Sequence, residues 1–581
     1  MKILLAAINA KYIHSNPAVY SLRAYACRYK EDIGIAEYTI NQTVDEILMD
    51  IYRRRPDILC ISCYLWNIRY VEQVIREIPK ILPEITIWLG GPEVSFDGRE
   101  RLESCPCLTG IMCGEGEETF LELMDYYHGQ TEPGMTLEQI RGIVYRDEPG
   151  NIHINPPRPV MDLSRVPFVY SHIEDFRNRI IYYESSRGCP FSCSYCLSSI
   201  DKCLRFRDIG LVKKELQFFI DHEVPQVKFV DRTFNCRHDH AMAVWSYIKE
   251  HDRGITNFHF EVAADLLNEE EIRLIQGMRP GLIQLEIGVQ SANEQTIREI
   301  RRKMDLEKVG QVTARIREGG NVHQHLDLIA GLPYENYESF IRSFNRVYAM
   351  KPDQLQLGFL KVLKGSLMHD KAREYGLISQ ERSPYEVLST KWLSYGDIIR
   401  LKQVEEMVEI YYNSAQFRYT MAHLEREFSS PFAMYEALAL YYEAEGLSKV
   451  SHSRLARYEI LYRFIRARQV KNTEEYLEWL TLDLYLRDNV KNRPDFLGES
   501  RVSREEASAF YKKEAEEFRY LKGYEGYDRN QLRKMTHLER VRGKLLLFDY
   551  RSRNRLTNDA SVFCVDGPAL TADDGEETEK K

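Results

Sequence analysis

The first 125 residues alternate short apolar runs with stretches of helical periodicity. The apolar runs are KILLAAI, IGIAEYTI, PDILCISCYL, ITIWLGG and LTGIMCGEGE, and amphipathic segments separate them. Strands that alternate with helices predict a parallel, doubly wound α/β sheet. In such a sheet the ligand binds outside the carboxyl ends of the strands. We therefore expect the functional residues of this front domain, residues 1–130, in the turns that follow its strands.

A second strand-helix pattern begins near residue 180. Its candidate strands are 180–186, 227–231, 258–263, 283–288, 325–331 and 354–360. Segments such as LVKKELQFFIDH and NYESFIRSFNRVYAM lie between them and are long enough to be crossover helices. Six consecutive units of this kind predict an open (β/α)6 barrel, a partial TIM barrel, over 180–370. Function in such a barrel is carried at the carboxyl ends of the strands.

The remaining segments show neither pattern. The Pro-rich stretch 131–179 has no helical period and predicts a linker with a small hairpin. After about residue 380, segments rich in Tyr, Arg and Glu predict a mainly helical domain of unknown function over 380–560. The acidic tail 565–581 is expected to be disordered.

Composition narrows the class of protein. The chain has 581 residues, of which 44% are hydrophobic and 29% charged, as is typical of a folded protein with several domains. A formal net charge of -9 gives no electrostatic reason to expect a nucleic-acid partner. No stretch approaches the roughly 20 apolar residues of a membrane span, and MKILLAAINAKYIHS fits a buried first strand better than an export signal. We expect a cytoplasmic protein with no membrane partner.

Twelve cysteines in such a chain indicate reduced thiols or metal ligation rather than disulfides. Cys189, Cys193 and Cys196 form a CxxxCxxC pattern in SSRGCPFSCSYCLSS, at the end of the first barrel strand. A tight loop of this kind can aim three thiolates at one cuboidal 4Fe-4S cluster and leave the fourth iron open. The alternatives are three free cysteines or a structural zinc, although zinc usually takes four protein ligands and the nearest further cysteine is Cys203.

This cysteine pattern after a first barrel strand resembles the radical S-adenosylmethionine superfamily, and the likeness extends over about 180–365. The resemblance implies an enzyme whose open iron chelates the methionyl amine and carboxylate of S-adenosylmethionine. It also implies an external one-electron donor of the flavodoxin or ferredoxin class. In such an enzyme the cofactor supplies the radical chemistry, while the protein fixes orientation and excludes water.

Several strand ends resemble the S-adenosylmethionine contacts of that superfamily. By this resemblance Tyr195 lies against the adenine and Glu261 holds the ribose. VDRTFN resembles the segment that binds the methionyl amine, LEIGVQS the fourth-strand segment, and DLIAGLPYE the fifth-strand turn beside the adenine. The cofactor-binding residues implied within these three segments are Asp231, Arg232, Glu286, Gln290, Ser291 and Gly331.

The front domain carries three features in a suggestive order. His14 in YIHSNP follows the first strand, Ser62 in SCYL ends the third, and Gly90 and Gly91 end the fourth. This order resembles the cobalamin-binding fold, whose motifs are Asp-x-His-x-x-Gly, Ser-x-Leu and Gly-Gly. Paired glycines let a bulky ring or nucleotide tail approach the backbone closely. GEGEETF then looks like the last strand-to-helix turn of that fold. The resemblance implies cobalamin as a cofactor.

Three departures from the cobalamin-binding pattern put the cobalt ligand in doubt. Tyr12 stands where the pattern has the Asp that polarises a ligating imidazole, Pro17 replaces Gly, and SCYL spaces its Leu one residue further. A metal-bound histidine normally has its other nitrogen oriented by an acceptor. Cobalamin ligated by His14, cobalamin bound without a histidine, and a degenerate domain that only recognises substrate therefore all stay open.

The other cysteines indicate no equally specific site. Cys60 and Cys63 form a CxxC inside a predicted buried strand, where packing as small hydrophobic residues is the better interpretation. Cys105, Cys107 and Cys113 are candidates for a second cluster.

Together these patterns predict a radical S-adenosylmethionine enzyme that forms a 5′-deoxyadenosyl radical and transfers a methyl group, with the help of cobalamin, to an unknown substrate. Fold and motifs alone do not fix the outcome of the reaction. One alternative is a radical cyclase or rearrangement enzyme with a vestigial front domain. The other is a non-enzymatic corrinoid or redox sensor, although the C-terminal region has no helix-turn-helix signature.

Overall fold

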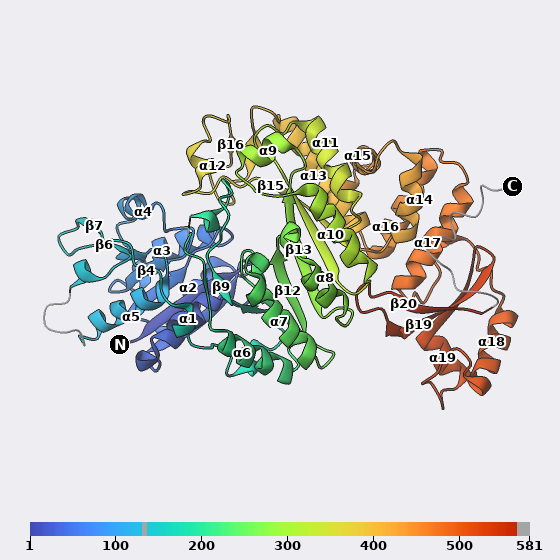
Figure 1. Ribbon diagram of the computed structural model, residues 1–581, viewed down its shortest axis with the longest axis horizontal. Coiled ribbons are helices and arrows are strands. Elements are labelled where there is room, and N and C mark those ends of the chain that lie inside the picture. Colours follow the sequence, from blue (N-terminus) through green and yellow to red (C-terminus); the bar gives the residue numbers. More distant parts are fainter. Residues whose placement is uncertain (130–135, 201, 566–581) are drawn as a thin grey trace. The chain divides into compact units, whose positions relative to one another are not determined.

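A computed structural model describes residues 1–129, 136–200 and 202–565 (Figure 1). The chain forms two compact units, one of Met1–Phe340 with Gly358–Ile398 and one of Ile341–Leu357 with Ile399–Lys581. The first unit contains the front domain and most of the barrel, and the second contains most of the helical C-terminal region. Apart from residue 565, the tail that was expected to be disordered lies outside the described residues.

The front domain is built on a seven-stranded sheet in the order β2-β1-β3-β4-β5-β6-β7. Strands β1 to β5 are parallel, as predicted, and β6 and β7 continue the sheet antiparallel. The hairpin expected within the linker is thus part of this sheet. The strand bounds are β1 Ile3–Asn9, β2 Ile33–Thr39, β3 Ile58–Ser62, β4 Thr86–Gly90, β5 Gly110–Met112, β6 Ile143–Arg146 and β7 Ile152–Ile154.

Helices cover both faces of this sheet (Figure 1). Successive side chains of a strand point to opposite faces, so alternate residues of β1 enter two separate hydrophobic clusters. One cluster includes side chains of α1 (Pro17–Tyr25) and α5 (Gly116–Tyr127). The other includes side chains of α2 (Val44–Arg54), α3 (Ile68–Ile81) and α4 (Gly98–Ser104). Each fully buried Leu, Ile or Phe side chain contributes about 1.5 to 3 kcal/mol of transfer free energy.

The strand order of the front sheet locates its binding crevice. Chain order reverses between β1 and β3, because β2 lies on one side of β1 and β3 to β5 lie on the other. A ligand of a doubly wound sheet binds outside the carboxyl ends of the strands at such a reversal. The turns after β1 and β3 therefore border the crevice, and these turns contain His14 and follow Ser62.

The barrel is a six-stranded sheet in the order β15-β14-β13-β12-β11-β8, which confirms the predicted open barrel. The strand pairs from β8 to β14 are parallel. The strand bounds are β8 Ile181–Tyr183, β11 Gln226–Phe229, β12 Asn257–Val262, β13 Ile283–Gln290, β14 His323–Ala330 and β15 Gln354–Phe359. The helices that follow them are α6 Ile209–Asp221, α7 His238–His251, α8 Glu269–Gln276, α9 Glu294–Glu299, α10 Leu306–Glu318, α11 Tyr337–Tyr348 and α12 Leu367–Asp370.

The two faces of the barrel sheet differ in polarity. Along β13 buried apolar residues alternate with partly exposed polar ones. Phe260 of β12 contacts Trp245 of α7, so the apolar face packs against the helices. His259 and Glu261, the neighbours of Phe260 on that strand, point to the opposite face because side chains alternate along a strand. That inner face carries the charged residues.

The second unit is mainly helical, as predicted, and ends in a three-stranded antiparallel sheet. Side chains of α17 pack on one face of this sheet, and side chains of α18 and α19 pack on the other. The helix bounds are α13 Tyr395–Val408, α14 Arg418–Leu424, α15 Pro431–Ala444, α16 Arg454–Ala467, α17 Thr473–Arg487, α18 Arg504–Glu517 and α19 Arg529–Met535. The strands are β18 Thr536–Val541, β19 Lys544–Arg553 and β20 Ala560–Cys564.

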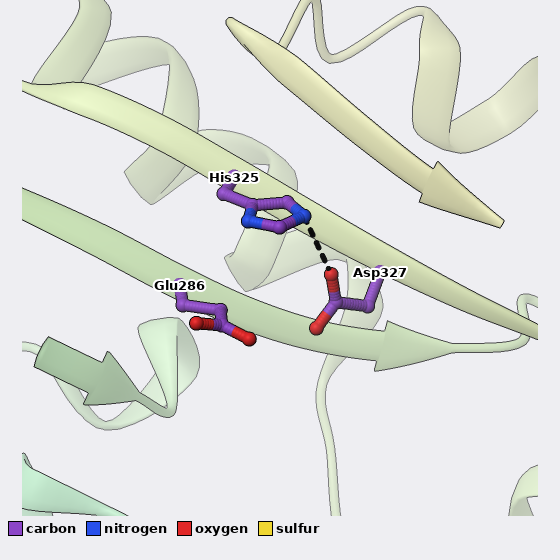
Figure 2. A group of neighbouring side chains, drawn as sticks. All are labelled: Glu286, His325 and Asp327. Atoms are coloured by element: carbon purple, nitrogen blue, oxygen red, sulfur yellow. Dashed lines mark ion pairs between the residues drawn. The ribbon is translucent and has the colours of Figure 1, made fainter. Parts of the chain in front are cut away.

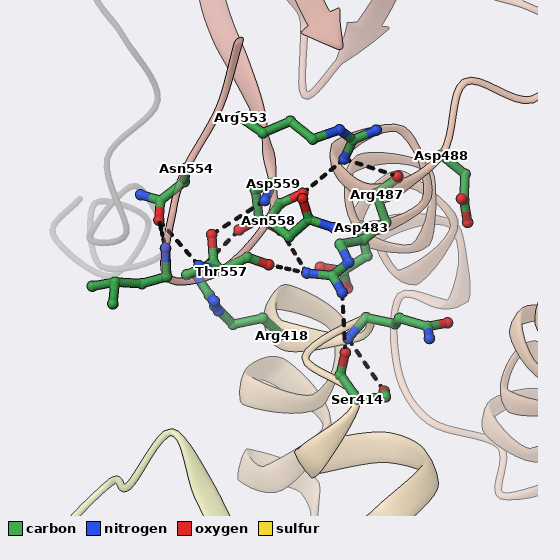
Figure 3. Close-up of polar contacts among 12 residues, drawn as sticks. Ser414, Arg418, Asp483, Arg487, Asp488, Arg553, Asn554, Thr557, Asn558 and Asp559 are labelled. Carbon is green, nitrogen blue, oxygen red and sulfur yellow. Dashed lines mark hydrogen bonds and ion pairs between the residues drawn. The ribbon is translucent and has the colours of Figure 1, made fainter. Parts of the chain in front are cut away.

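Arginines fasten α17 to the turn between β19 and β20 (Figure 3). Arg487 donates to the carbonyl oxygens of Thr557 and Ser414, and Arg553 donates to the carbonyl oxygens of Arg487 and Asn558. Each guanidinium thus bonds several acceptors within this unit. The contacts are those of a structural crosslink rather than of a binding site.

Among the residues that the structure describes, no helix combines the length and the apolar character that crossing a membrane requires. This agrees with the absence of a long apolar run in the sequence. The expected cytoplasmic location stays a prediction.

Candidate functional site

The cysteine loop, residues 188–204, leaves the barrel directly after its first strand. The short strands β9 (Ser186–Arg187) and β10 (Arg205–Phe206) pair antiparallel and close the loop at its base. Gly188 begins the loop with φ +93°, and a Cβ atom there would lie 2.9 Å from the carbonyl oxygen of Cys203. Only glycine fits both the conformation and the close approach.

The loop contains the three cysteines of the CxxxCxxC pattern, which form no disulfide. Cys189 and Cys193 are buried, with 8% and 7% of their surface exposed, and Cys196 is half-buried. Burial raises the pKa of Cys193, while the nearby charge of Arg302 lowers it. Arg302 Nη1 lies 3.8 Å from Cys193 Sγ, and the buried Ser194 Oγ makes no hydrogen bond. Three such thiols with a cation beside them fit the ligand set of an iron-sulfur cluster.

Arg302 is a residue that the sequence pattern did not indicate. It lies in the run RRKMD that follows α9, which is typical of a solvated surface turn. In the structure its guanidinium donates to the Gly288 carbonyl oxygen and lies beside Cys193 and Tyr195. No spacing in the sequence links position 302 to the cysteines, so this contact depends on the fold.

Asp231 supports the base of the cysteine loop. It is fully buried, and its carboxylate accepts hydrogen bonds from the Ser185 amide at 2.9 Å, the Ser185 hydroxyl at 2.7 Å and the Ser186 hydroxyl at 2.6 Å. Burial raises the pKa of Asp231 to about 6, although these hydrogen bonds lower it. His240 Nε2 lies 2.9 Å from the Ser185 hydroxyl. These contacts position the loop, and the expected contact of Asp231 with the methionyl amine stays a prediction.

The expected adenine and ribose residues lie near the cysteines and at strand ends. Tyr195 interacts with Cys193, and burial raises its pKa. Glu261 is the last residue but one of β12, where burial raises its pKa to about 7 and the charge of Arg232 lowers it.

The expected residues of the fourth and fifth strands gather where β13 and β14 end. Gln290 adopts a left-handed conformation with φ +73°. Ser291 donates a hydrogen bond of 2.7 Å to Glu335 Oε1. Gly331 has φ +91°, and a Cβ atom there would lie 2.7 Å from Val387 Cγ1. These positions therefore belong to two closely fitted turns, after β13 and after β14, at the carboxyl edge of the barrel.

Glu286 lies farther down β13 than these residues. Lys228 Nζ donates to Glu286 Oε2 at 3.2 Å, and His259 Nε2 lies 3.0 Å from the same oxygen. The close polar contact with His259 and the charge of Lys228 hold the pKa of Glu286 at about 2 in spite of its burial. The side chain is therefore engaged on the inner barrel face, and its contact with S-adenosylmethionine stays a prediction.

The expected corrinoid residues line the carboxyl edge of the front sheet. Asn16 Nδ2 donates to the Ser62 hydroxyl at 3.0 Å, while the buried Asn16 Oδ1 makes no hydrogen bond. Gly90 ends β4, and Gly91 has φ +117°, with a Cβ atom there falling 2.4 Å from the Cys63 carbonyl oxygen. An orphaned buried acceptor beside a hydroxyl at the crevice is a polar site of the kind that a nucleotide tail satisfies.

His14 turns toward the barrel. Its Nδ1 lies within hydrogen-bond reach of the Tyr182 hydroxyl on β8, and His14 also forms a parallel bridge with Ile180. Burial lowers the pKa of His14, and the charges of Lys11 and Lys228 lower it further. Tyr182 is an orienting partner that the sequence alone did not suggest. Whether His14 ligates cobalt stays a prediction.

Trp66 is a second residue that sequence reasoning missed. It follows β3, is 46% exposed, and stacks on Tyr64 with ring centroids 4.5 Å apart. Its indole Nε1 donates to the Ile8 carbonyl oxygen at 3.1 Å, which fixes the ring over the end of β1. An exposed, anchored aromatic ring at this crevice is a platform for a flat ligand. The signal was the aromatic pair in CYLW directly after a buried strand.

Glu115 joins the front domain to the cysteine loop. It lies in the turn after β5, and its Oε1 accepts from Arg187 at 2.7 Å and from Arg205. Arg187 belongs to β9 and Arg205 to β10, the two strands that close the loop. Burial alone would raise the pKa of Glu115, but a hydrogen bond from the Met161 amide and the two arginines lower it. The turn and the loop are therefore coupled electrostatically.

Four other cysteines, Cys60, Cys63, Cys105 and Cys107, behave as packed thiols. Cys60 and Cys63 are buried, and burial raises the pKa of each to about 12. Cys105 Sγ and Cys107 Sγ lie 3.1 Å apart, and Cys107 donates to the Ile75 carbonyl oxygen. The second cluster considered for this region stays without support from these contacts.

Three family models match successive parts of the chain. The B12 binding domain matches residues 3–124, the Radical SAM superfamily matches residues 183–347, and a protein family of unknown function, DUF4080, matches residues 373–562. The first two matches lie within the front domain and the barrel described above.

Curated relatives resemble the two α/β regions. The uncharacterized methyltransferase PH0819 of Pyrococcus horikoshii is 26% identical over 52% of this chain and 66% of its own length. The cobalamin-dependent radical SAM methyltransferase TokK of Streptomyces tokunonensis is 24% identical over 57% of this chain and 51% of its own. The anaerobic magnesium-protoporphyrin IX monomethyl ester cyclase of Rubrivivax gelatinosus is 22% identical over 56% of this chain and 60% of its own length. The chain thus spans about half to two thirds of these relatives.

Solved structures share the fold. The cobalamin-dependent radical enzyme OxsB superposes with a TM-score of 0.52 at 16% identity, and the superposition covers 83% of this chain and 78% of the OxsB chain. The methyltransferase TsrM of Kitasatospora setae gives a TM-score of 0.53 at 16% identity, and the superposition covers 66% of this chain and 81% of the TsrM chain. The two family matches agree with the cysteine loop of the barrel and the crevice of the front sheet. The chain belongs to the radical S-adenosylmethionine proteins that carry a B12-binding domain in front of the radical domain.

Proposed function

We propose that the chain is a cobalamin-dependent radical S-adenosylmethionine enzyme that transfers a methyl group to a substrate yet to be identified. The observation that carries the proposal is the cysteine loop, in which three cysteines follow the first barrel strand and Cys193 lies beside Arg302. The Trp66 platform at the crevice of the B12-binding fold supports the cobalamin part.

Cys189, Cys193 and Cys196 are the proposed ligands of a 4Fe-4S cluster with one open iron. When bound, the cluster supplies the electron that splits S-adenosylmethionine into methionine and a 5′-deoxyadenosyl radical, and cobalamin supplies a methyl carrier. Arg302 favours the ionised thiol of Cys193, the form that ligates iron. Asp231 holds the loop through Ser185 and Ser186.

The residues proposed to orient S-adenosylmethionine lie in the cysteine loop and at the ends of barrel strands. Tyr195 interacts with Cys193 and is proposed to lie against the adenine. Glu261, whose pKa the charge of Arg232 lowers, is proposed to hold the ribose. Gln290 and Ser291 are proposed contacts at the end of β13, and Gly331 lies in the turn after β14 that is proposed to border the adenine.

The residues proposed to hold cobalamin are His14, Ser62, Gly90 and Gly91, together with Trp66. Ser62 and Asn16 offer polar groups to a nucleotide tail, and Trp66 offers a flat apolar surface to the ring. Gly91 keeps the turn after β4 close to Cys63, so that the crevice stays open.

Methyl transfer is favoured over ring formation because two of the relatives reported above are methyltransferases, whereas one is a cyclase. Ring formation remains the second candidate. The two reactions differ in their products, since methyl transfer converts one S-adenosylmethionine to S-adenosylhomocysteine for each one that it cleaves reductively. We also propose that a one-electron donor of the flavodoxin or ferredoxin class reduces the enzyme.

The test is anaerobic purification with added cobalamin, followed by reduction with dithionite in the presence of S-adenosylmethionine. About four irons and one cobalt per chain, with formation of both 5′-deoxyadenosine and S-adenosylhomocysteine, are the expected result. Formation of 5′-deoxyadenosine without cobalt would support the cyclase or rearrangement reading instead. Absence of iron after reconstitution would overturn the proposal as a whole.

A further inference from the structure

A second group of metal-ligating side chains lies on the inner face of the barrel. Glu286 of β13 and His325 and Asp327 of β14 each present one ligand atom, and these atoms all lie within 4.8 Å of one another (Figure 2). Strand register brings them together, because Glu286 pairs with His325, and Gly288, two residues on, pairs with Asp327. We call Glu286, His325 and Asp327 the barrel triad.

The histidines of this region form ion pairs with carboxylates. His325 Nε2 lies 3.0 Å from Asp327 Oδ1, and His259 Nε2 lies 3.0 Å from Glu286 Oε2. Both histidines are more than nine-tenths buried, with 6% and 7% of their surface exposed. Both Nε2 atoms and Asp327 Oδ1 are buried polar atoms, and their close contacts are poorly aligned for hydrogen bonding. Buried nitrogen and oxygen atoms that approach so closely in poor alignment are arranged like ligands around a shared centre.

We propose that the barrel triad binds a divalent first-row transition-metal ion, such as Mn²⁺ or Zn²⁺. A mixed set of one imidazole and two carboxylates suits these ions, whereas Mg²⁺ and Ca²⁺ prefer oxygen ligands alone. Three protein ligands leave coordination positions open for water or for an oxygen of a substrate. His259 is placed to act as a further ligand or to orient the Glu286 carboxylate.

The charged side chain of Lys228 lies beside the triad, where it would compete with a bound metal ion for Glu286. Lys228 Nζ donates to Glu286 Oε2 at 3.2 Å, and its side chain is 29% exposed. Lys228 therefore occupies one carboxylate oxygen and opposes a second cation there. If the triad is only a salt-bridge network, loss of Lys228 leaves Glu286 with fewer partners. If it is a metal site, loss of Lys228 removes a competing charge.

The experiment uses the full chain with all three loop cysteines changed to alanine, so that cluster iron does not enter the count. Mn²⁺ is titrated and free ion is followed by its six-line electron paramagnetic resonance signal, with Zn²⁺ as a competitor. One equivalent of Mn²⁺ is expected to bind. Glu286→Gln, His325→Gln and Asp327→Asn are each expected to weaken binding by about 100-fold, since even loss of an outer partner costs about 10- to 100-fold.

Two further variants distinguish a metal site from a salt-bridge network. Lys228→Met is expected to tighten Mn²⁺ binding by about tenfold, because a like charge near the ion is removed. His128→Gln is the matched control, since His128 also pairs with a carboxylate, Asp32, at 3.1 Å, but in the front domain. It should leave binding unchanged. Pulsed resonance should detect a nitrogen ligand that the His325→Gln variant lacks.

The proposal is overturned if no stoichiometric Mn²⁺ or Zn²⁺ binds, or if the triad variants bind as the parent does. Weaker binding by Lys228→Met would also overturn it. The test requires no cluster and no radical chemistry. A failure here therefore leaves the proposed function standing, and a failure of the proposed function leaves the metal site standing.

Discussion

The two parallel sheets of the first unit place their polar side chains differently. Every residue of β1 in the front domain is buried, because helices cover both faces of that sheet. Along β13 of the barrel buried and partly exposed residues alternate strictly, because helices cover only the outer face. The inner face of the barrel is thus free to carry Lys228, His259 and Glu286.

This difference determines where each sheet can bind a ligand. In the front domain the polar groups that border the crevice lie where strands end, so we expect its ligand to sit against residues such as Ser62 and Gly91. The barrel has a loop at the edge and a charged inner face below it. If the two sheets bind separate cofactors, a substitution in a turn of the front sheet should remove cobalamin, and a substitution in the cysteine loop should remove the iron-sulfur cluster.

The largest expected effect is that of Cys193→Ala in the cysteine loop. A site with three thiolates cannot hold a cluster after losing one, so iron should fall from about four per chain to near zero, and 5′-deoxyadenosine formation should cease. Cobalt content should stay as in the parent, because the front sheet is unchanged. Iron, sulfide and cobalt analysis checks this. The exposed Cys27→Ala is the control, and a Cys193→Ala protein that retained its iron would contradict the assignment.

The converse substitution is Gly91→Ala in the front domain. Gly91 has φ +117°, and a Cβ atom there would lie 2.4 Å from the Cys63 carbonyl oxygen, so the turn after β4 must move. We expect a loss of about 3 kcal/mol of stability from backbone strain and the clash. If about half of this cost falls on cobalamin binding, the affinity for cobalamin drops at least about tenfold, because 1.4 kcal/mol corresponds to a factor of ten. Cobalt content should fall accordingly, while iron is retained.

Gly129→Ala is the matched control for that substitution. Gly129 also has a positive φ, +62°, but a Cβ atom there meets nothing within 4 Å. Its replacement should cost about 1 kcal/mol or less and leave both metals bound. Equal cobalt loss in both variants would mean that strain alone, rather than the crevice at Gly91, explains the result.

The same comparison explains what could be predicted from the sequence. Both folds were predictable, because strand and helix periods alternate clearly, and the three cysteines stand together in one loop. Arg302 was not, because it comes from a basic turn that touches Cys193 only after β13 and α9 have folded. Trp66 lies close to Ser62 in the sequence, but only the structure shows that its ring is exposed.

The barrel triad had a weak signal in the sequence. HLDLIA and IQLEIG carry polar residues at every second position, which is the pattern of a strand with one polar face. The register that sets Glu286 beside His325 cannot be read from either segment alone. The resemblance predicts a cofactor contact for Glu286, and the structure adds its contacts with Lys228 and His259, which the sequence did not indicate.

The third prediction concerns Asp231, which lies beneath the cysteine loop. Asp231→Ala leaves one buried amide and two hydroxyls without their acceptor and should cost about 3 kcal/mol. Asp231→Asn can keep an acceptor toward the Ser185 amide, while the hydroxyls of Ser185 and Ser186 rotate to accept. We therefore expect the amide variant to retain iron and the alanine variant to lose part of it, as measured by urea unfolding and iron analysis.

The sign of the pH dependence follows from the raised pKa of Asp231. Burial raises it from 3.8 to about 6, so the folded state binds the proton more tightly than the unfolded state. The resulting stabilisation is fully present below about pH 4 and is lost as the pH rises to about 6, and it amounts to about 3 kcal/mol. Asp231→Asn should flatten this slope, and an unchanged slope would contradict the assignment.

The smallest effect is expected at Glu115, where the two regions meet. Glu115→Gln removes the charge shared by Arg187 and Arg205 and turns a donor toward the Met161 amide, so about 1 to 2 kcal/mol should be lost. The exposed pair of Glu77 with Lys80 gives the control, since Glu77→Gln should cost less than about 0.5 kcal/mol. Because Glu115 belongs to the front domain but acts on the strands that close the cysteine loop, iron retention during dilution should fall along with stability. Unchanged iron retention would mean that the loop is held by Asp231 alone, and that the front domain and the cluster are independent.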